Sequence, residues 1–194
     1  LEAGATFAQG KIALLTELLN QARIEEQQNM DQDKQKLIYA LNERTGQAIE
    51  EINAYEFLTP KEKAEIIADY IEKIRDEGVT KIWDTTTYVD AEKVYNQAIE
   101  AINEALLNVK KEDAYGKIEQ HVLELLDGGT ITNDISKIVI EAFDDVDGQT
   151  TYEDIDATVD EALKKLTDTI FAEVNAKKDE IREILETHAG EPIP

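Results

Sequence analysis

The chain contains no cysteine and only one methionine. Without cysteine, neither a disulfide framework nor a thiolate metal site can form, and redox chemistry gives no indication of the compartment. The scarcity of oxidisable sulfur is consistent with an oxidising exterior. Serine occurs once, at Ser136, inside a predicted helix and outside any Gly-x-Ser-x-Gly turn. Catalysis by a serine or cysteine nucleophile is therefore effectively excluded.

Positive charge is also scarce. Twenty Lys and Arg residues stand against 43 Asp and Glu residues, which gives a formal net charge of −23. A chain of this sign repels nucleic acid phosphates and anionic membrane surfaces. No run of about 18 apolar residues is present either. We therefore expect neither a nucleic acid partner nor membrane insertion. The 194 residues are 42% hydrophobic, enough to bury a core in one or two domains.

The first residues, Leu1 to Lys11, lack the charged and apolar regions of a signal peptide. We therefore expect that an exported protein of this sequence would be an internal fragment. Leu1 and Glu2 are interpreted as a cloning remnant.

The alternation of apolar and polar residues that indicates a strand is absent, and helical periodicity prevails. Three long helical patterns are present, and each consists of an apolar stripe, a polar segment and a second stripe. They span Ala5–Phe57, Thr85–Leu126 and Tyr152–His188. The polar segments are Glu25–Lys36, Lys110–Asp113 and Asn175–Glu180, and we expect them to be helical and comparatively exposed. The fold is predicted to be all-α.

The pattern from Thr85 to Leu126 would form a helix of about 60 Å, more than one small domain can cover. Its apolar stripe shifts by one residue across the polar segment. The first stripe comprises Ala91, Tyr95, Ala98, Ile102, Ala105 and Val109, and the second comprises Tyr115, Ile118, Val122 and Leu125. This predicts a helix shared by two consecutive bundles.

Part of the sequence repeats. The segment TTYEDIDATVDEAL parallels the earlier segment TTYVDAEKVYNQAI, with Tyr152 matching Tyr88 and Ala162 matching Ala98. This match between positions 64 residues apart is here called the internal repeat. Such regular spacing is typical of a repeat architecture in which each unit is one supersecondary element.

Shorter helices are predicted between the long ones. Thr59 and Glu62 form a capping box around Pro60, so a helix should begin at Pro60 and run to about Trp83, with Gly78 as a possible break. Its counterpart should run from Asn133 to Val146, with Thr132 or Asn133 as the N-cap. Glycine pairs and turns, including Gly128-Gly129, act as helix stops.

Together these helices predict tandem three-helix bundles. The predicted domains are a last helix of a preceding bundle over 1–30, bundles over 31–109 and 110–174, and the start of a following repeat over 175–194. We expect the chain to be cut from a longer array, and to pack against neighbouring repeats of the same chain.

Few residues suggest chemistry. Asp144–Asp154 is acidic and contains Gly148, but Phe143 would occupy the first ligand position of a calcium loop, so a helix end, turn and N-cap is the better interpretation. His121 and His188 lack the spacing of a di-iron or zinc site. Acidic pairs such as Glu50-Glu51 lie opposite the stripes, where a solvated surface is expected. We predict no catalytic residue, cofactor or metal.

Five aromatic residues lie near predicted bundle ends or stripes. They are expected to fill the core, with an exposed patch for a protein partner as the alternative. They are Tyr55, Phe57, Trp83, Tyr88 and Tyr95.

The segments LTPKEK (Leu58–Lys63), IWDTTTYVD (Ile82–Asp90) and AIEAI (Ala98–Ile102) resemble a known family. They are similar to uncharacterised helical repeats of giant cell-wall-anchored surface proteins of Gram-positive bacteria, of the extracellular-matrix-binding-protein-homologue type. The resemblance covers residues 38–107, and 114–174 only in part, because Gly129–Thr132 replaces the Leu-Thr-x-x-Glu-Lys start and the middle helix is shorter.

The resemblance implies spectrin-like three-helix bundles joined by shared helices into an elongated rod. It also implies an extracellular location on the bacterial surface and a non-enzymatic role as a structural spacer or adhesive stalk. The alternative is a specific binding module for a host serum or extracellular-matrix protein. The departures between 114 and 174 leave the binding role of the second bundle open.

Overall fold

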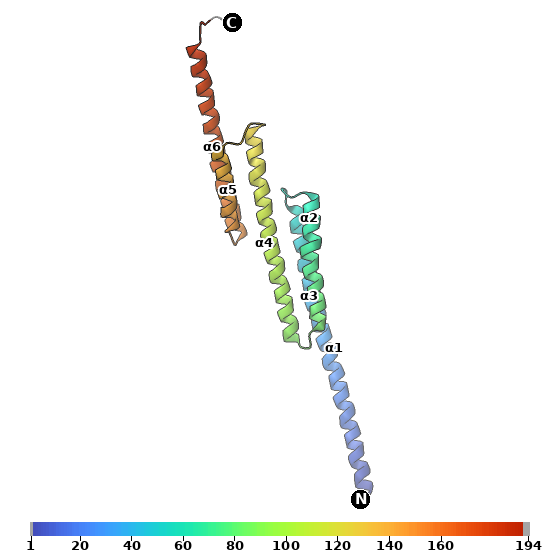
Figure 1. Ribbon diagram of the computed structural model, residues 1–194. Helices are drawn as coiled ribbons and strands as arrows, with labels where there is room; N and C mark the ends of the chain where they lie inside the picture. Colours follow the sequence, from blue (N-terminus) through green and yellow to red (C-terminus); the bar gives the residue numbers. More distant parts are fainter. Residues whose placement is uncertain (1, 192–194) are drawn as a thin grey trace. The chain divides into compact units, whose positions relative to one another are not determined.

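The computed structural model describes residues 2–191, and this range is helical with turns and contains no strand. The elements are α1 (Glu2–Ala54), α2 (Pro60–Ile66), the π-helix η1 (Ile67–Glu72), α3 (Lys73–Asp84), α4 (Tyr88–Leu126), α5 (Asn133–Asp147) and α6 (Tyr152–Thr187) (Figure 1). The all-α prediction is confirmed, and each of the three long patterns forms one continuous helix. Leu1, half of the predicted cloning remnant, lies outside the described residues.

The helix starts follow local capping chemistry. The Thr59 N–H donates to Glu62 Oε2 at 2.7 Å, and the Glu62 N–H donates to Thr59 Oγ1 at 3.2 Å. These are the two bonds of a capping box, so the start at Pro60 is confirmed. Thr132 caps α5 through the N–H of Ile135 at 3.3 Å, which settles the choice between Thr132 and Asn133.

The chain forms two compact units. Among the described residues, the first comprises 2–51 and 64–104, and the second comprises 52–63 and 105–191, so that α4 contributes to both. The boundaries predicted for the repeats, 31–109 and 110–174, differ from those of the compact units and stay a prediction.

In the first unit, three helices converge at Gly78 of α3. A Cβ at this glycine would lie 2.9 Å from Leu41 Cδ2 of α1 and 3.2 Å from the Ala98 Cβ of α4. Gly78 therefore allows close helix packing. The expectation that it breaks the helix is wrong, because α3 continues to Asp84. The buried apolar residues of this unit are Leu41, Ala48, Ile71, Ile82, Ala91, Ala98 and Ile102.

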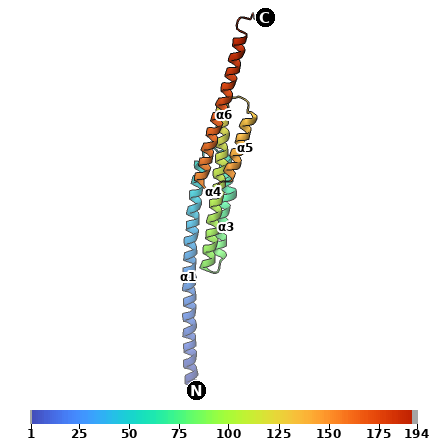
Figure 2. The same cartoon turned by 90° about the vertical axis from the view of Figure 1, so that its left-hand side faces the viewer.

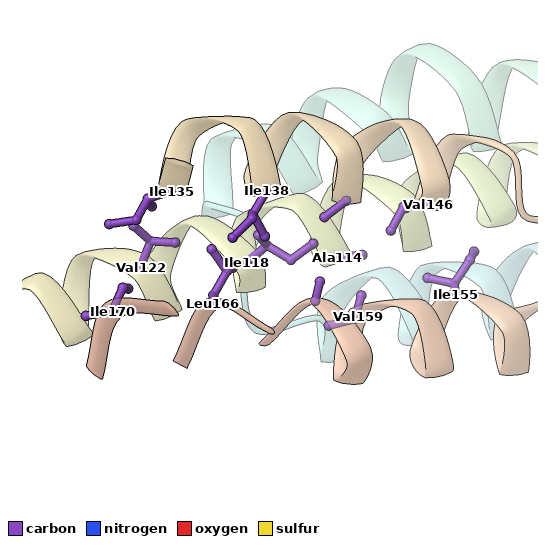
Figure 3. Close-up of a cluster of buried hydrophobic side chains, with 12 residues drawn as sticks. Ala114, Ile118, Val122, Ile135, Ile138, Val146, Ile155, Val159, Leu166 and Ile170 are labelled. Atoms are coloured by element: carbon purple, nitrogen blue, oxygen red, sulfur yellow. The ribbon is translucent and has the colours of Figure 1, made fainter. Parts of the chain in front are cut away.

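In the second unit, α4, α5 and α6 enclose one core, and α5 lies alongside α6 (Figure 2). Figure 3 shows the side chains pointing toward one another from all three helices. The buried residues are Ala114, Ile118 and Val122 of α4, Ile135, Ile138, Ala142 and Val146 of α5, and Ile155, Val159, Ala162, Leu166 and Ile170 of α6. Burial of such side chains contributes roughly 1.5–3 kcal/mol each.

The internal repeat is visible in the burial of the side chains. Buried positions of η1, α3 and the first half of α4 have buried counterparts in α5 and α6. The pairs are Ile71 and Ile135, Gly78 and Ala142, Ile82 and Val146, Ala91 and Ile155, Ala98 and Ala162, Ile102 and Leu166, and Leu106 and Ile170. The N-caps match too. Thr87 Oγ1 accepts from the Asp90 N–H, and Thr151 Oγ1 accepts from the Asp154 N–H, both at 3.1 Å.

Two details of the stripes differ from prediction. Leu106 and Ala114 are buried, whereas Ala105 and Tyr115 are only half-buried; Val109, the last residue of the first stripe, is buried. In the helix that begins at Pro60, the apolar Ala64 is exposed. The π-helix begins three residues after Ala64 and contains the buried Ile71, so regular α-helical spacing does not hold between these two positions.

The three polar segments are helical, as predicted. Asn175–Glu180 is exposed throughout, but the other two segments are not. Lys34 is only 3% exposed, and the Lys110 side chain is 18% exposed. Both lysines bind partners within their own unit, which accounts for their burial. No helix within residues 2–191 combines the length and apolarity needed to cross a bilayer.

Candidate binding surfaces

A lysine closes the end of the middle helix in each unit. In the first unit, Lys34 Nζ donates to the carbonyl oxygens of Trp83 at 3.1 Å and Thr85 at 2.6 Å. In the second unit, Lys111 Nζ donates to the carbonyl oxygen of Asp147 at 2.6 Å. Asp147 is the counterpart of Trp83 in the internal repeat. A cation at a helix C-terminus satisfies carbonyls that lack intrahelical donors and complements the helix dipole.

A groove in the second unit, here called the α4 groove, lies between the end of α1 and α4. Four residues of α4 line it: Lys110, Asp113, Ala114 and Lys117. Ala54 to Phe57 line it from the end of α1 and its loop, and Asp156 and Val159 line it from α6. Its volume is about 190 Å³.

The walls of the α4 groove are fixed by specific contacts. Lys110 Nζ lies 2.6 Å from Asp156 Oδ1, and 5.9 Å from the ring centroids of Tyr55 and Tyr152. The Phe57 N–H donates to Asp113 Oδ1 at 2.8 Å. Such paired charges and cation–π contacts position the loop and the helices rather than activate a reacting group.

A second groove, here called the α6 groove, lies where α4 ends and α6 continues. It has a volume of about 590 Å³. Its apolar walls are Leu125 and Leu126 of α4 and Ile170, Val174 and Ile181 of α6. Lys177 and Lys178 lie beside them, with Glu173 and Glu180. A groove of this size, with an apolar floor and charged residues beside it, can accept apolar side chains of a protein partner.

A third surface, here called the α1 stripe, is the apolar face of the first half of α1. Its large side chains are between 52% and 66% exposed: Phe7, Ile12, Leu14, Leu15, Leu18 and Leu19. Every described residue from 2 to 29 is exposed. An exposed row of large apolar side chains of this kind is a candidate surface for packing against another protein segment.

The acidic segment Asp144–Asp154 serves two helix ends. Asp147 ends α5, and Thr151 Oγ1 donates to Asp154 Oδ2 at 2.7 Å at the start of α6. The carbonyl oxygens of Asp144 and Asp145 accept from Gly148 and Gln149. Within residues 2–191, no group of three or more His, Asp or Glu residues is placed to hold a metal ion.

In this region, Tyr115 is the residue whose pKa is shifted furthest from its ordinary value. Its hydroxyl donates to Asp147 Oδ1 at 3.0 Å, and its ring lies 4.7 Å from that of Phe143. Burial, this hydrogen bond and nearby carboxylates raise the pKa of Tyr115 to about 12. At neutral pH the hydroxyl is protonated, so it stabilises the helix end as a donor.

The other sequence candidates lie apart. His121 Nε2 is 2.8 Å from Thr167 Oγ1 in the second unit, and His188 Nδ1 is 2.9 Å from Glu191 Oε2. Ser136 is half-buried on α5. Glu50 is exposed and Glu51 half-buried. These residues do not form a common cluster.

The prediction that the five aromatic residues fill the cores is wrong, because none of them is fully buried. Trp83 and Tyr88 are 42% and 40% exposed, and Tyr95 is half-buried, all in the first unit. Tyr55 and Phe57 are half-buried beside the α4 groove. Aliphatic residues and alanine fill the cores instead, and Tyr115 and Phe143 pack against the edge of the core of the second unit.

The sequence interpretation missed the helix-capping role of Lys34 and Lys111. The available signal was their spacing, because each precedes a fully buried position, Leu41 or Ile118, by two helical turns. The grooves could not be found in this way, since they depend on which helices end side by side.

No family model, curated protein or solved structure matches this chain.

Proposed function

We propose that this chain is a non-enzymatic repeat segment of a bacterial cell-surface protein, located outside the cell. In this proposal, tandem spectrin-like three-helix bundles share long helices and form an elongated rod that acts as a structural spacer or adhesive stalk. The observation that carries it is the internal repeat of buried positions and helix caps. Repetition of one structural unit is what a spacer needs and what an active site does not need.

The continuity of α4 supports this proposal. The helix contributes residues 88–104 to one compact unit and 105–126 to the other. A continuous helix resists bending where a loop does not, so repeats joined in this way would transmit force along the chain. The net charge of −23 would also oppose collapse of neighbouring segments on one another.

Small-angle scattering tests the rod, and Glu112→Pro tests its shared helix. Glu112 is exposed on α4, and proline there removes a backbone donor and clashes with the preceding turn, at about 3 kcal/mol or more. The maximum dimension should be that of an elongated particle for the parent chain and should change in the variant. Glu112→Ala is the control. An unchanged scattering curve and melting temperature for Glu112→Pro would refute the shared-helix proposal.

The second candidate is a binding module for a host serum or matrix protein. The exposed apolar stripe of α1 favours it, since such a surface suits a protein partner. Pull-down of purified serum and matrix proteins by the immobilised chain distinguishes the two candidates. A spacer retains none of them above the level of an unrelated helical protein.

A further inference from the structure

The α4 and α6 grooves are repeat counterparts. Lys110, Asp113, Ala114 and Lys117 line the α4 groove. Their counterparts in the internal repeat line the α6 groove, and they are Val174, Lys177, Lys178 and Ile181. The last residue of a long helix also lines each groove, Ala54 of α1 in one and Leu126 of α4 in the other. The two grooves therefore occupy the same place in successive copies of one architecture.

The grooves differ in one wall. Asp156 and Val159, from the first two turns of α6, close the α4 groove to about 190 Å³. Within residues 2–191, no equivalent third helix borders the α6 groove, which has a volume of about 590 Å³. The α4 groove thus indicates what should cover the α6 groove: the first turns of a helix with the apolar spacing of α6.

The α1 stripe has that spacing. In α6, the buried residues Ile155, Val159, Ala162, Leu166 and Ile170 follow a 4-3-4-4 pattern. In α4, the same pattern is formed by Ala91, Tyr95, Ala98, Ile102 and Leu106. In the first half of α1, the pattern runs through Ala3, Phe7, Gly10, Leu14 and Leu18, all of which are exposed, and Phe7, Leu14 and Leu18 belong to the α1 stripe. Phe7 occupies the position of Val159, and Gly10 occupies the position of Ala98 and Ala162.

Charge permits this pairing between two copies of a strongly acidic chain. Residues 2–24 contain two acidic residues, Glu2 and Glu17, and two basic residues, Lys11 and Arg23. Their formal net charge is therefore zero, although the whole chain carries −23. Beside the α6 groove, Lys177 and Lys178 are balanced by Glu173 and Glu180, so its lining carries no formal net charge either. The two surfaces can approach without the repulsion that other pairs of surfaces would meet.

We propose that the chain self-associates head to tail, with the α1 stripe of one copy packed into the α6 groove of a second copy. Phe7 fills the place beside the groove that Val159 fills in the α4 groove, and Leu14 and Leu18 continue the contact. The interface is heterologous, because two different surfaces meet. This inference rests on the internal repeat and does not require a location on the bacterial surface. If self-association fails, the proposed function is therefore not refuted, and the reverse also holds.

Sedimentation velocity of the full chain over a wide concentration range tests the proposal. The weight-average mass of the parent chain should rise with concentration. Added sodium chloride should strengthen the association, because it screens the repulsion between acidic chains. Phe7→Glu and Ile181→Glu should each remain monomeric at concentrations where the parent associates. Both side chains are exposed, at 66% and 57%, so neither substitution should alter the thermal unfolding curve.

Ile140→Glu is the matched control, since Ile140 is 61% exposed on α5 and borders neither surface. It should associate as the parent does. The decisive sample is an equimolar mixture of Phe7→Glu and Ile181→Glu chains. Each retains one intact surface, so a one-to-one dimer should form where neither variant alone associates.

Three results would overturn the proposal. One is a parent chain that stays monomeric at every concentration and ionic strength. Another is an Ile181→Glu chain that still dimerises, which would indicate that two α1 stripes pair with each other. The third is a mixture of the two variants that stays monomeric, since a head-to-tail interface requires complementation.

Discussion

Gly116 of α4 lies directly against the backbone of Phe57, so that a Cβ at position 116 would be 2.7 Å from the Phe57 carbonyl oxygen and 2.8 Å from its Cβ. Backbone atoms cannot move aside as a flexible side chain can. We therefore expect Gly116→Ala to destabilise the second unit by about 1–3 kcal/mol, as overpacking usually does. The free energy of unfolding in urea measures the effect.

Gly46→Ala is the matched control for Gly116→Ala. Gly46 lies inside α1, and a Cβ there would meet nothing within 4 Å. Alanine has the higher helix propensity, so this change should stabilise the first unit by roughly 0.5–1 kcal/mol. If both substitutions stabilise the chain, the close contact between Gly116 and Phe57 does not exist in solution.

Lys34→Met should reveal the energetic value of the buried lysine cap. The substitution keeps the apolar stem and removes the donor to the Trp83 and Thr85 carbonyl oxygens. Leaving buried acceptors unpaired costs about 1–3 kcal/mol. Lys36→Met, which removes only an exposed ion pair with Asp33, should change stability by less than about 0.5 kcal/mol. Equal losses in chemical denaturation would refute the capping role.

Ile102→Ala tests the core of the first unit. Ile102 is fully buried, so truncation should cost about 2–5 kcal/mol through lost transfer free energy and a residual cavity. Leu166→Ala, its repeat counterpart in α6, should cost a similar amount. Glu100→Ala, on the exposed face of α4, should change little. Comparable losses for Ile102→Ala and Glu100→Ala would show that α4 presents a different face to the core.

Alkaline titration should detect the environment of Tyr115. Its folded pKa of about 12 lies above the ordinary value of 10, so the folded state binds the proton more tightly than the unfolded state. The stabilisation linked to this proton is fully present below pH 10 and should be lost as the pH rises toward 12. Ultraviolet absorbance of tyrosinate measures the pKa directly. Tyr115→Phe should remove the component that titrates near 12, and its persistence would contradict the assignment.

Calcium should not stabilise the chain. The carboxylates of Asp147 and Asp154 accept hydrogen bonds from Tyr115 and Thr151, and the acidic segment contains two helix ends rather than a ligand loop. Calcium or a chelator should therefore shift the melting temperature only as far as ionic screening of a −23 chain allows. A lower melting temperature with chelator, restored by calcium but not by sodium at equal ionic strength, would establish a calcium site.

Local chemistry made the helices predictable. The Thr59 and Glu62 capping box and the Thr132 cap each act within one turn, and the apolar periodicity of α4, α5 and α6 identifies the buried face of each helix. The burial of Ile102 at the middle of its stripe follows from the same periodicity. These features depend on residues that are close together in the chain, so they can be recognised in the sequence alone.

Contacts between distant segments were not predictable in this way. Lys34 is polar and lies in a polar segment, yet its amine reaches carbonyls 49 and 51 residues away. Gly78 and Gly116 resemble helix breakers until the partner helix or loop is placed against them. Lys110 is drawn inward by Asp156, which belongs to α6, with the whole of α5 intervening along the chain.

The π-helix Ile67–Glu72 also bears on how the two middle helices of this chain can differ in length. One middle helix spans residues 60–84, whereas its counterpart spans only 133–147. A π-turn accommodates an inserted residue without rotating everything that follows, so Ile71, Gly78 and Ile82 remain buried despite the longer start. The two middle helices can thus differ in length at their starts, where the backbone can widen, while their later turns present the same buried positions.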